Sequence, residues 1–372
     1  MKIASIFGAR PQFIKVALLS RQFDNDGVQH LVINTGQHYD ALMADVFLQD
    51  LGMRAPDYDL EVGSASHAVQ TALILDRVEE VLFREKPDAV VVYGDTNSTI
   101  GGALAASKCH IPIAHVEAGL RSFNRRMPEE INRIVADHLA DLHLVPGRAA
   151  ANQLMREGIA QSKVSIVGDI LYDSILAHLE LVNRSDTLSR LGLEGCEYVL
   201  CTVHRAENID DPVRRTRIFE SLSRVAKELT IIFPVHPRSR KAIEASAEEA
   251  ALLRDVQLID PVGHLDMLAL QKNAAVIATD SGGVQREAFY LNRPCVVLRN
   301  ETEWTELVAA GWNTLVPPDG SSDIARSILS LVGNTGIPGV KPYGDGHAAA
   351  KISIAVQQLC LKSSTCVETV PS

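Results

Sequence analysis

Short apolar runs alternate with longer amphipathic stretches along most of the chain. In the first half, the runs that predict buried strands are residues 2–7, 30–34, 89–93, 111–116, 142–145 and 164–167. Stretches with apolar residues at helical spacing separate them, for example residues 66–85 and 129–139. Strands that alternate with helices in this way predict βαβ units and a parallel sheet.

The same alternation starts again after a polar stretch at residues 183–189. The apolar runs of this second half are residues 198–203, 230–235, 256–259, 275–279 and 295–298. We therefore predict two doubly wound α/β domains, residues 1–171 and 172–344, which also suits a chain of 372 residues. Residues 345–362 predict a last helix that crosses back to the first domain, and residues 363–372 predict a frayed tail.

Composition and charge narrow the class of protein. The chain is 46% hydrophobic and 22% charged, as in globular proteins, and its net charge is -10. A negative chain lacks the basic face that nucleic acid or an anionic membrane requires. Residues 1–7 are too short for a secretory signal, and the six cysteines form no CxxC pair. These features predict a cytoplasmic enzyme with reduced cysteines and without a membrane segment.

Carboxylates stand at the ends of predicted strands in the first domain. Asp95 and Glu117 each follow an apolar run, and Glu129 opens a helix. Arg133 on that helix and the nearby Arg121 are candidates for binding the substrate. Ligands of open α/β sheets bind at the carboxyl ends of the strands, where crowded carboxylates suit general acid and base work. The alternative is structural, because Asp95 could cap a helix and Glu129 could simply favour the helix dipole. No spacing of histidines predicts a metal site.

A second set of candidates is suited to an anion. Residues 280–283 (Asp-Ser-Gly-Gly) leave a strand and enter a helix, so that the backbone N–H groups of Ser281, Gly282 and Gly283 could hold a diphosphate. Glu287, further along this helix, could accept hydrogen bonds from ribose hydroxyls. The alternative is a capped helix whose glycines serve tight packing.

Cations and histidines complete the candidates. Arg10, in the turn after the first strand, could clamp a diphosphate, although a plain surface arginine is the alternative. Lys15, in the same segment, is a second candidate for substrate binding. His204 ends the first strand of the second domain and could contact the leaving phosphate. His236 and Arg238 follow the next strand and could offer the substrate a second cationic contact. His115 lies within a predicted strand, and we expect it to be buried and hydrogen-bonded. Because no GxGxxG turn occurs, no nicotinamide cofactor is predicted, nor any other cofactor.

Six motifs in order resemble the non-hydrolysing UDP-N-acetylglucosamine 2-epimerases: residues 8–12 (GARPQ), 94–96 (GDT), 115–122 (HVEAGLRS), 127–133 (MPEEINR), 202–205 (TVHR) and 279–283 (TDSGG). The resemblance implies a GT-B-type fold, with two Rossmann-like domains and an active-site cleft between them, and usually a homodimer. It assigns catalytic roles to Asp95, Glu117 and Glu129, and places His204 near the diphosphate. Arg10, Ser281, Gly282, Gly283 and Glu287 match the UDP-binding positions.

Three departures from the family pattern matter, and the first two bear on the sugar. Gln12 follows Pro11 where glutamate is commoner, and residues 302–306 (TEWTE) and 311–313 (GWN) replace the usual motif. These variants look more like the branch that acts on UDP-2,3-diacetamido-2,3-dideoxyglucuronate for surface polysaccharides such as lipopolysaccharide. Residues 37–44 (QHYDALMA) lack the additional glutamines that bind an activating second substrate in many members, so allosteric control is not expected.

The resemblance predicts reversible epimerisation at C2 of a UDP-2-acetamido sugar, through elimination of UDP to a 2-acetamidoglucal. Three alternatives stay open: a GT-B glycosyltransferase with a UDP-sugar donor, a hydrolysing epimerase that releases free N-acetylmannosamine, and a sensor that binds UDP-sugar without turnover.

Overall fold

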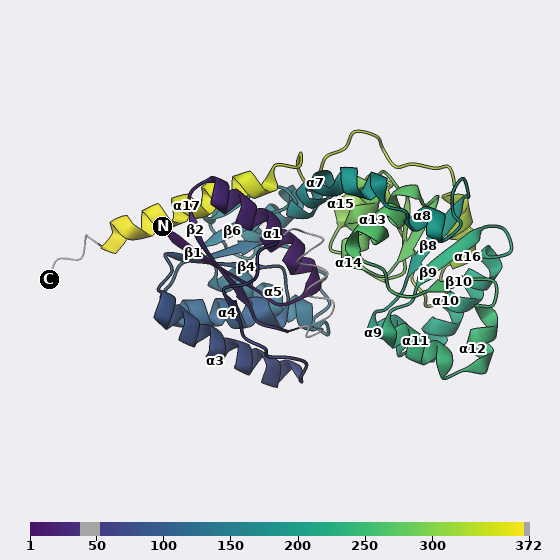
Figure 1. Ribbon diagram of the computed structural model, residues 1–372, viewed down its shortest axis with the longest axis horizontal. Helices are drawn as coiled ribbons and strands as arrows, with labels where there is room; N and C mark the ends of the chain where they lie inside the picture. The colour runs from purple at the N-terminus through teal and green to yellow at the C-terminus, as the bar shows by residue number, and fades with distance from the viewer. Residues whose placement is uncertain (38–52, 368–372) are drawn as a thin grey trace. The chain divides into compact units, whose positions relative to one another are not determined.

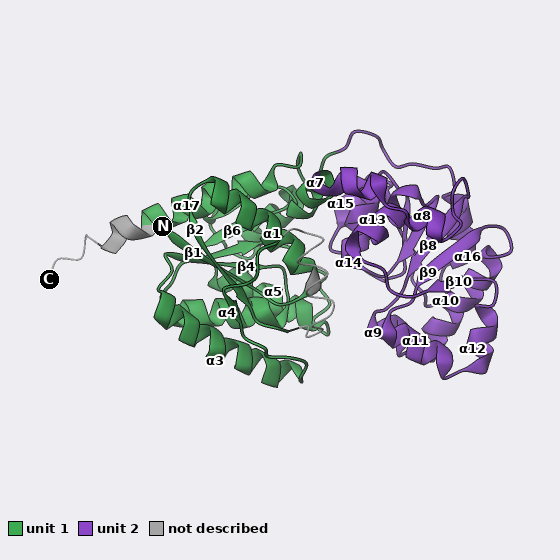
Figure 2. Cartoon of the chain, in the orientation of Figure 1, with its two compact units in different colours: residues 1–176, 341–372 green, residues 177–340 purple. Residues whose placement is uncertain are grey.

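The computed structural model describes residues 1–37 and 53–367, and the side chains of Arg10 and of residues 363–367 lie outside this description. The chain forms two compact units (Figure 2): unit 1 comprises Met1–Leu176 and Lys341–Ser372, and unit 2 comprises Ala177–Val340. The first division falls inside a continuous helix, α7 (Ile170–Arg184), which begins in unit 1 and ends in unit 2. Each unit is described by itself.

Unit 1 contains a seven-stranded sheet in the order β3-β2-β1-β4-β5-β6-β7, and all its strand pairs are parallel. The strands are β1 (Lys2–Phe7), β2 (Gln29–Asn34), β3 (Tyr58–Asp59), β4 (Ala89–Tyr93), β5 (Ile113–Val116), β6 (Leu142–Val145) and β7 (Val164–Ile166). The predicted strands are confirmed, except that the sequence did not indicate β3. Strand β5 begins at Ile113 rather than at residue 111, since Pro112 has no N–H to donate to a neighbouring strand.

Helices cover both faces of this sheet, as the apolar character of its strands requires (Figure 1). The helices of unit 1 are α1 (Arg10–Asn25), α3 (His67–Glu85), α4 (Asn97–Lys108), α5 (Pro128–Leu139), α6 (Arg148–Arg156), the first part of α7, and α17 (Ala348–Val367), with a short 3-10 turn at Gln161–Lys163. One core contains side chains of α1 and α17, and the other contains side chains of α3, α4 and α5. The last helix of the chain therefore packs on the first domain.

Unit 2 contains a six-stranded parallel sheet in the order β10-β9-β8-β11-β12-β13. Its strands are β8 (Tyr198–Thr202), β9 (Thr230–Pro234), β10 (Gln257–Ile259), β11 (Val276–Thr279), β12 (Cys295–Val297) and β13 (Asn313–Leu315), of which the sequence did not indicate β13. Its helices are the end of α7, α8 (Thr187–Arg190), α9 (Ala206–Ile209), α10 (Pro212–Val225), α11 (Pro237–Glu244), α12 (Ala247–Leu252), α13 (His264–Asn273), α14 (Gly282–Tyr290), α15 (Thr305–Ala309) and α16 (Ile324–Ser330). Apolar cores lie on both faces of the sheet.

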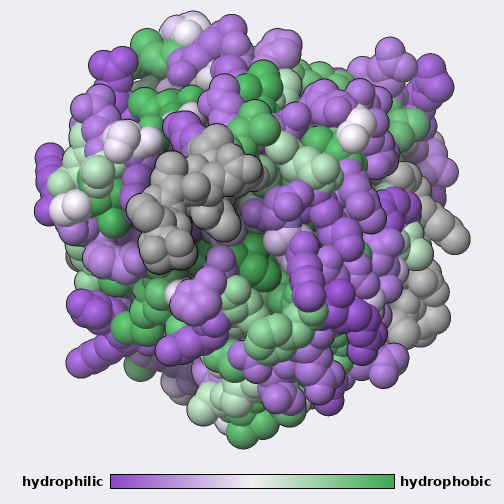
Figure 3. Space-filling model, turned by 90° about the vertical axis from the view of Figure 1, so that its left-hand side faces the viewer, coloured by the Kyte–Doolittle hydropathy of each residue, from purple (hydrophilic) through white to green (hydrophobic). Residues whose placement is uncertain are grey.

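Strand order places the candidate residues close together within each unit. Tyr93 of β4 pairs with Val116 of β5, so the turns that carry Asp95 and Glu117 are neighbours. In unit 2, Thr202 of β8 pairs with Thr279 of β11, which brings together the turns that follow these strands. Hydrophilic and hydrophobic residues are interspersed on the face drawn in Figure 3. None of the helices in the described part of the chain is long and apolar enough to span a bilayer.

Candidate active site

Two carboxylates of unit 1 follow neighbouring strands, and each has a buried cation as its partner. The Asp95 carboxylate accepts from the Arg133 guanidinium of α5, and the Glu117 carboxylate accepts from the Lys15 ammonium of α1. The cations are nearly inaccessible to solvent, with side chains 6% exposed for Arg133 and 4% for Lys15. Each carboxylate is thus held by a buried cation at the carboxyl end of its strand.

Glu117 also has an unusual backbone. Its φ is +68°, in the left-handed region that side-chain-bearing residues seldom adopt. Such conformations cost roughly 1–3 kcal/mol and cluster at functional sites. Gly119 has φ +80° two residues later, and a Cβ there would lie 2.6 Å from the Ala150 carbonyl oxygen. The β5–α5 turn therefore depends on these two residues for its shape.

The first turn of α5 carries two glutamates in different environments. Glu129 is exposed, as a residue that contacts a ligand must be. Glu130 is 1% exposed, and its carboxylate accepts from the Ser122 N–H (2.9 Å), the Ser122 hydroxyl (3.0 Å) and the Phe123 N–H (2.9 Å). It also pairs with Arg133 at 3.1 Å. Nothing in the sequence indicated this supporting role for Glu130.

Amide side chains fix the turns around Asp95. Asn132 of α5 donates to the Asp95 carbonyl (3.0 Å) and to the Asn97 side chain (3.1 Å). Gln12 accepts from the Gly8 and Ala9 N–H groups through its carbonyl oxygen and donates through its nitrogen to the Tyr93 carbonyl (2.7 Å). A carboxylate could not make this last bond, because it has no N–H. The contact gives a structural reason for glutamine at this departure from the family pattern.

Arg121 supports the same region from the interior. Its guanidinium is 2% exposed and bonds to Asp137 (2.7 Å), Glu157 (2.6 Å) and the Leu120 carbonyl (2.6 Å). Burial alone would raise the pKa of Asp137, but the His115 imidazole and the Arg121 guanidinium outweigh it and hold that pKa below its usual range. We predicted a substrate contact for Arg121, and these contacts fit a supporting role better.

Other predictions for unit 1 have different outcomes. His115 is fully buried and bonds to Asp137 (2.7 Å) and to the Gly94 carbonyl (2.7 Å), which confirms a satisfied core histidine. Arg10 begins α1, but its side chain lies outside the described atoms, so its role at the diphosphate stays a prediction. Most of the 37–44 segment, residues 38–44, also lies outside the described residues.

In unit 2, the glycine turn after β11 leaves open space in front of its backbone. Ser281 is the N-cap of α14, and Gly282 and Gly283 form the first helical positions. A Cβ added at Gly282 would approach nothing closer than the Trp304 Nε1 at 3.7 Å, and one at Gly283 nothing closer than the Ser281 Oγ at 3.9 Å. Packing therefore does not require these glycines. Close approach of a ligand to the N-terminus of α14 would require them, because a side chain there would stand in its way.

Asp280 organises the neighbouring turn after β8. Its buried carboxylate accepts from the backbone N–H of His204 (3.1 Å) and of Arg205 (3.0 Å), and from the Asn208 side chain (3.1 Å). The His204 ring is 39% exposed, and its centroid lies 5.5 Å from that of His236. The sequence placed Asp280 in the glycine motif but gave no sign that it shapes the histidine turn.

The remaining candidates of unit 2 lie on α11 and α14. His236 caps α11 by accepting from the Arg238 N–H at 3.2 Å, and the Arg238 side chain is exposed. Glu287 lies on α14, where Gln271 donates to its carboxylate at 2.6 Å. Among the residues that the structure describes, no group of three or more His, Cys, Asp or Glu side chains could hold a metal ion.

The tryptophans of the two unusual motifs, Trp304 and Trp312, both pack against side chains of α14. The Arg286 guanidinium carbon lies 4.1 Å from the centroid of the Trp304 ring, an arrangement that favours a cation–π interaction. The Trp312 ring meets the edge of Phe289 at 5.9 Å between centroids. The unusual motifs at residues 302–306 and 311–313 therefore line the helix whose N-terminus is the diphosphate candidate.

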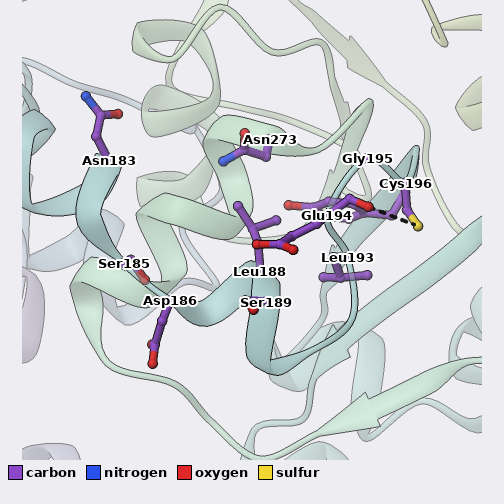
Figure 4. A pocket seen from close by; sticks show the side chains of 11 residues that line it. Asn183, Ser185, Asp186, Leu188, Ser189, Leu193, Glu194, Gly195, Cys196 and Asn273 are labelled. Carbon is purple, nitrogen blue, oxygen red and sulfur yellow. Dashed lines mark hydrogen bonds between the residues drawn. The ribbon is translucent and has the colours of Figure 1, made fainter.

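Unit 2 also has a groove near the amino end of β8 (Figure 4). It has a volume of about 710 Å³, and Asn183, Asp186, Glu194 and Tyr198 are among the residues that line it. Tyr198 is the first residue of β8, whereas His204 follows the last, so the groove lies at the amino end of that strand. It is separate from the candidate site.

Comparison with known proteins places the chain in a family. The sequence profile of the UDP-N-acetylglucosamine 2-epimerases matches residues 21–357. A UDP-2,3-diacetamido-2,3-dideoxy-D-glucuronate 2-epimerase of Pseudomonas aeruginosa is 44% identical over 358 residues, 95% of this chain and 98% of its own. A UDP-N-acetylglucosamine 2-epimerase homolog of Methanococcus maripaludis is 46% identical over 367 residues, 96% of this chain and 100% of its own.

Solved structures agree with the sequence relatives. The crystal structure of the Methanocaldococcus jannaschii UDP-GlcNAc 2-epimerase in complex with UDP-GlcNAc and UDP superposes with a TM-score of 0.88 at 38% identity, over 96% of this chain and all of that one. The GT-B-type architecture with two Rossmann-like domains, as predicted, is confirmed by this similarity. The chain belongs to the UDP-N-acetylglucosamine 2-epimerase family.

Proposed function

We propose that this enzyme interconverts the C2 epimers of a UDP-linked 2-acetamido sugar without hydrolysing it, in the synthesis of surface polysaccharides. Family membership and relatives at 44% and 46% identity support the reaction class. The observation that carries the proposal is the pairing of Asp95 with Arg133 and of Glu117 with Lys15 at neighbouring strand ends. Such paired carboxylates suit proton transfer at a sugar carbon.

The chemistry needs a way to make the C2 proton acidic, since no carbonyl group adjoins it. Breaking the C1–O bond supplies this, because positive charge develops at C1 as the bond weakens. One carboxylate takes the C2 proton, the C1–O electron pair leaves with UDP, and a 2-acetamidoglucal forms. A second acid returns a proton to the opposite face of C2, and the UDP oxygen adds back to C1.

Roles are proposed separately for the residues of each unit. Asp95, Glu117 and the exposed Glu129 are the candidates for base and acid, with the assignment among them open. The Ser281-Gly282-Gly283 N–H groups and His204 would stabilise the departing diphosphate, together with Arg10, while Glu287 would bind the ribose. Well-placed donors of this kind contribute about 3–4 kcal/mol each in other enzymes.

Proton exchange at C2 is the sharpest test. In deuterium oxide, NMR of the purified protein with UDP-N-acetylglucosamine and, separately, with its 2,3-diacetamido uronate analogue should show deuterium at C2 of the product. Epimerised product without deuterium contradicts the mechanism. Free N-acetylmannosamine with UDP would indicate a hydrolysing enzyme, and donor consumption only with an acceptor would indicate a glycosyltransferase.

We also propose that the enzyme is a homodimer, as the family resemblance implies. Light scattering of the purified chain at micromolar concentration should give twice the mass of one chain, 40.4 kDa. A monomer mass at all concentrations contradicts this.

A further inference from the structure

The turn after β4, which carries Asp95, is tied to the interior by a histidine. The side chain of His115 in β5 is 0% exposed, and its Nε2 lies 2.7 Å from the Gly94 carbonyl oxygen, one residue before Asp95. Gly94 has φ +60°, a conformation that favours glycine, and its N–H donates to the Val116 carbonyl at 2.9 Å. Both backbone groups of Gly94 are therefore bonded to β5, and they set the direction in which the chain continues into Asp95.

The other ring nitrogen of His115 is held by α5. Its Nδ1 lies 2.7 Å from the carboxylate of Asp137, a residue that is fully buried as well. The second oxygen of that carboxylate accepts from the Gly119 N–H at 3.1 Å, two residues after Glu117. One buried pair is thus bonded to the backbone of the turn after β4 and of the turn after β5.

The partners of the ring determine how many protons it carries. Burial raises the pKa of Asp137, but the adjacent His115 and Arg121 lower it further, to below its usual range, so the carboxylate is ionised. An ionised carboxylate and a backbone carbonyl can only accept hydrogen bonds, so both ring nitrogens of His115 must donate. A ring that donates from both nitrogens is an imidazolium. Its charge is matched within the same cluster, because Asp137 and Glu157 face His115 and Arg121.

We propose that His115 is a positioning residue for the epimerisation: as an imidazolium between Asp137 and the Gly94 carbonyl, it fixes the turn that presents the Asp95 carboxylate to the substrate. The inference rests on the proposed function and adds to it a residue that does not touch the substrate. A hydrogen bond from a cation to a carbonyl is stronger than one between neutral groups. Its loss lets the turn relax, and a displacement of about 1 Å at a reacting group can lower a rate by about 100-fold.

Two substitutions of His115 separate its two hydrogen bonds. The amide nitrogen of glutamine reaches about as far from the backbone as Nε2 of histidine, and that of asparagine about as far as Nδ1. His115→Gln can therefore keep the donor to Gly94, whereas His115→Asn keeps the donor to Asp137 and loses the other. With each sugar that the wild-type enzyme converts, His115→Asn should lower kcat by about 10- to 100-fold and leave KM within about threefold. His115→Gln should keep kcat within about fivefold of the wild type.

His143 provides a matched control on the neighbouring strand. It is fully buried on β6, in register with His115, and its ring bonds to the carbonyls of Asp137 (2.7 Å) and Lys163 (3.2 Å). Those carbonyls belong to α5 and to the 3-10 turn before β7, not to the turns that carry the candidate carboxylates. His143→Asn should therefore lower Tm, because buried carbonyls lose a donor, and should keep kcat within about twofold. A loss of kcat as large as that of His115→Asn contradicts a specific role for His115.

NMR tests the charge of the ring without any substitution, so its result stands even if a variant fails to fold. In wild-type protein labelled with 15N, the ring signals of His115, assigned through their couplings to its backbone, should show both nitrogens protonated at neutral pH. One unprotonated nitrogen in this ring overturns the proposal. An equal loss of kcat in the two His115 variants, a greater loss in His115→Gln, or no loss in His115→Asn overturns it too, while epimerisation stands. If the wild type epimerises neither sugar, the proposed function itself fails, whatever the state of the ring.

Discussion

Glu129 and Glu130 are adjacent in the sequence, yet the helix points them to different surroundings. Glu129 is exposed in the first turn of α5, where its carboxylate is accessible to a ligand. Glu130 is buried and bonds to two backbone N–H groups and to Arg133, which in turn holds Asp95. Consecutive residues of a helix point in different directions, and here one carboxylate is available for chemistry and the other for support.

Substitution of the two glutamates should therefore give different results. In Glu130→Gln, the new NH2 group would face the N–H of Ser122 or of Phe123, and two donors cannot bond to each other. The free energy of unfolding should therefore fall by about 2–3 kcal/mol, which calorimetry would show as a lower Tm. Turnover should also fall, since Arg133 loses a partner, mainly through kcat rather than KM.

Glu129→Gln is the matched control. It should leave Tm within about 1 °C and reduce turnover by orders of magnitude, as expected for a proton-transfer residue on the surface. Equal losses of Tm in the two variants would contradict the division of roles.

His30 shows how a buried polar residue links stability to pH. Its ring bonds to the hydroxyls of Ser5 (2.8 Å) and Ser20 (3.0 Å), and Ser5 bonds to Tyr93 (2.6 Å). Burial, aided by the nearby Arg54 charge, lowers the pKa of His30 to about 3. The folded protein therefore keeps this imidazole neutral where an unfolded chain would protonate it.

The sign of the pH effect follows from that difference. Below pH 6.5 the unfolded chain binds a proton that the folded protein does not, so stability is full above pH 6.5 and is lost as pH falls toward 3. Between pH 7 and pH 5 this single group should remove about 2 kcal/mol from the free energy of unfolding. The free energy of unfolding is measured with urea at pH 7 and at pH 5. The difference between the two pH values should be smaller in His30→Gln by about 2 kcal/mol, and unchanged in the exposed His138→Gln.

The β11–α14 turn allows packing and ligand binding to be separated experimentally. A Cβ at Gly283 meets only ordinary contacts, whereas a Cβ at Gly102 in α4 would lie 2.9 Å from the Ile6 side chain. Gly283→Ala should stabilise unit 2 by about 0.5–1 kcal/mol, because alanine favours a helix and restricts the unfolded chain. Calorimetric titration should nevertheless show UDP binding weakened about tenfold or more, since the methyl group occupies the open side of the turn.

Gly102→Ala should behave in the opposite way. It overpacks the core of unit 1, lowers stability by about 1–3 kcal/mol and leaves UDP affinity unchanged. If Gly283→Ala binds UDP normally, the glycines of this turn are not there for a diphosphate.

The strands that sequence predicted well are those that form an apolar run. The apolar runs at residues 89–93 and 198–203 became β4 and β8 almost to the residue. Strand β12 (Cys295–Val297) has only 3 residues, but all are apolar, and it was predicted too. Strands β3 and β13, Tyr58–Asp59 and Asn313–Leu315, lie at sheet edges and contain polar residues, so neither forms an apolar run. Apolar content, rather than length, decided what could be predicted.

Sequence likewise indicated some residues of the candidate site and not others. Asp95, Glu117 and the glycine turn stand at strand ends, and this placement is readable from sequence. The supporting contacts of Glu130 and Asp280 join residues that are separate in sequence, such as Asp280 with His204. Such pairings exist only once the strands are in register, so sequence could suggest the reacting groups but not what holds them.

The chain order of the two units has a consequence for folding. Unit 2 is one continuous segment with both of its apolar cores inside residues 177–340. Unit 1 is interrupted, since its core needs Ile352, Val356 and Cys360 of α17 in addition to residues of the first 171. Burial of side chains such as Ile and Val contributes roughly 1.5–3 kcal/mol each, and a domain is stable by only about 5–15 kcal/mol in all.

Fragments should therefore behave unequally. Residues 177–340 expressed alone should unfold cooperatively and bind UDP within about tenfold of the full chain, without turnover because Asp95 and Glu117 are missing. Residues 1–176 alone should show no cooperative unfolding by circular dichroism, because the loss of α17 uncovers the face of α1. The Asp169 N–H bonds to the Tyr343 carbonyl at 2.9 Å, so the two parts of unit 1 meet, and fusing 1–176 to 341–372 through a short Gly-Ser linker should restore the transition. Cooperative unfolding of 1–176 without its helix would show that the remaining core suffices, and that α17 adds stability rather than completing the fold.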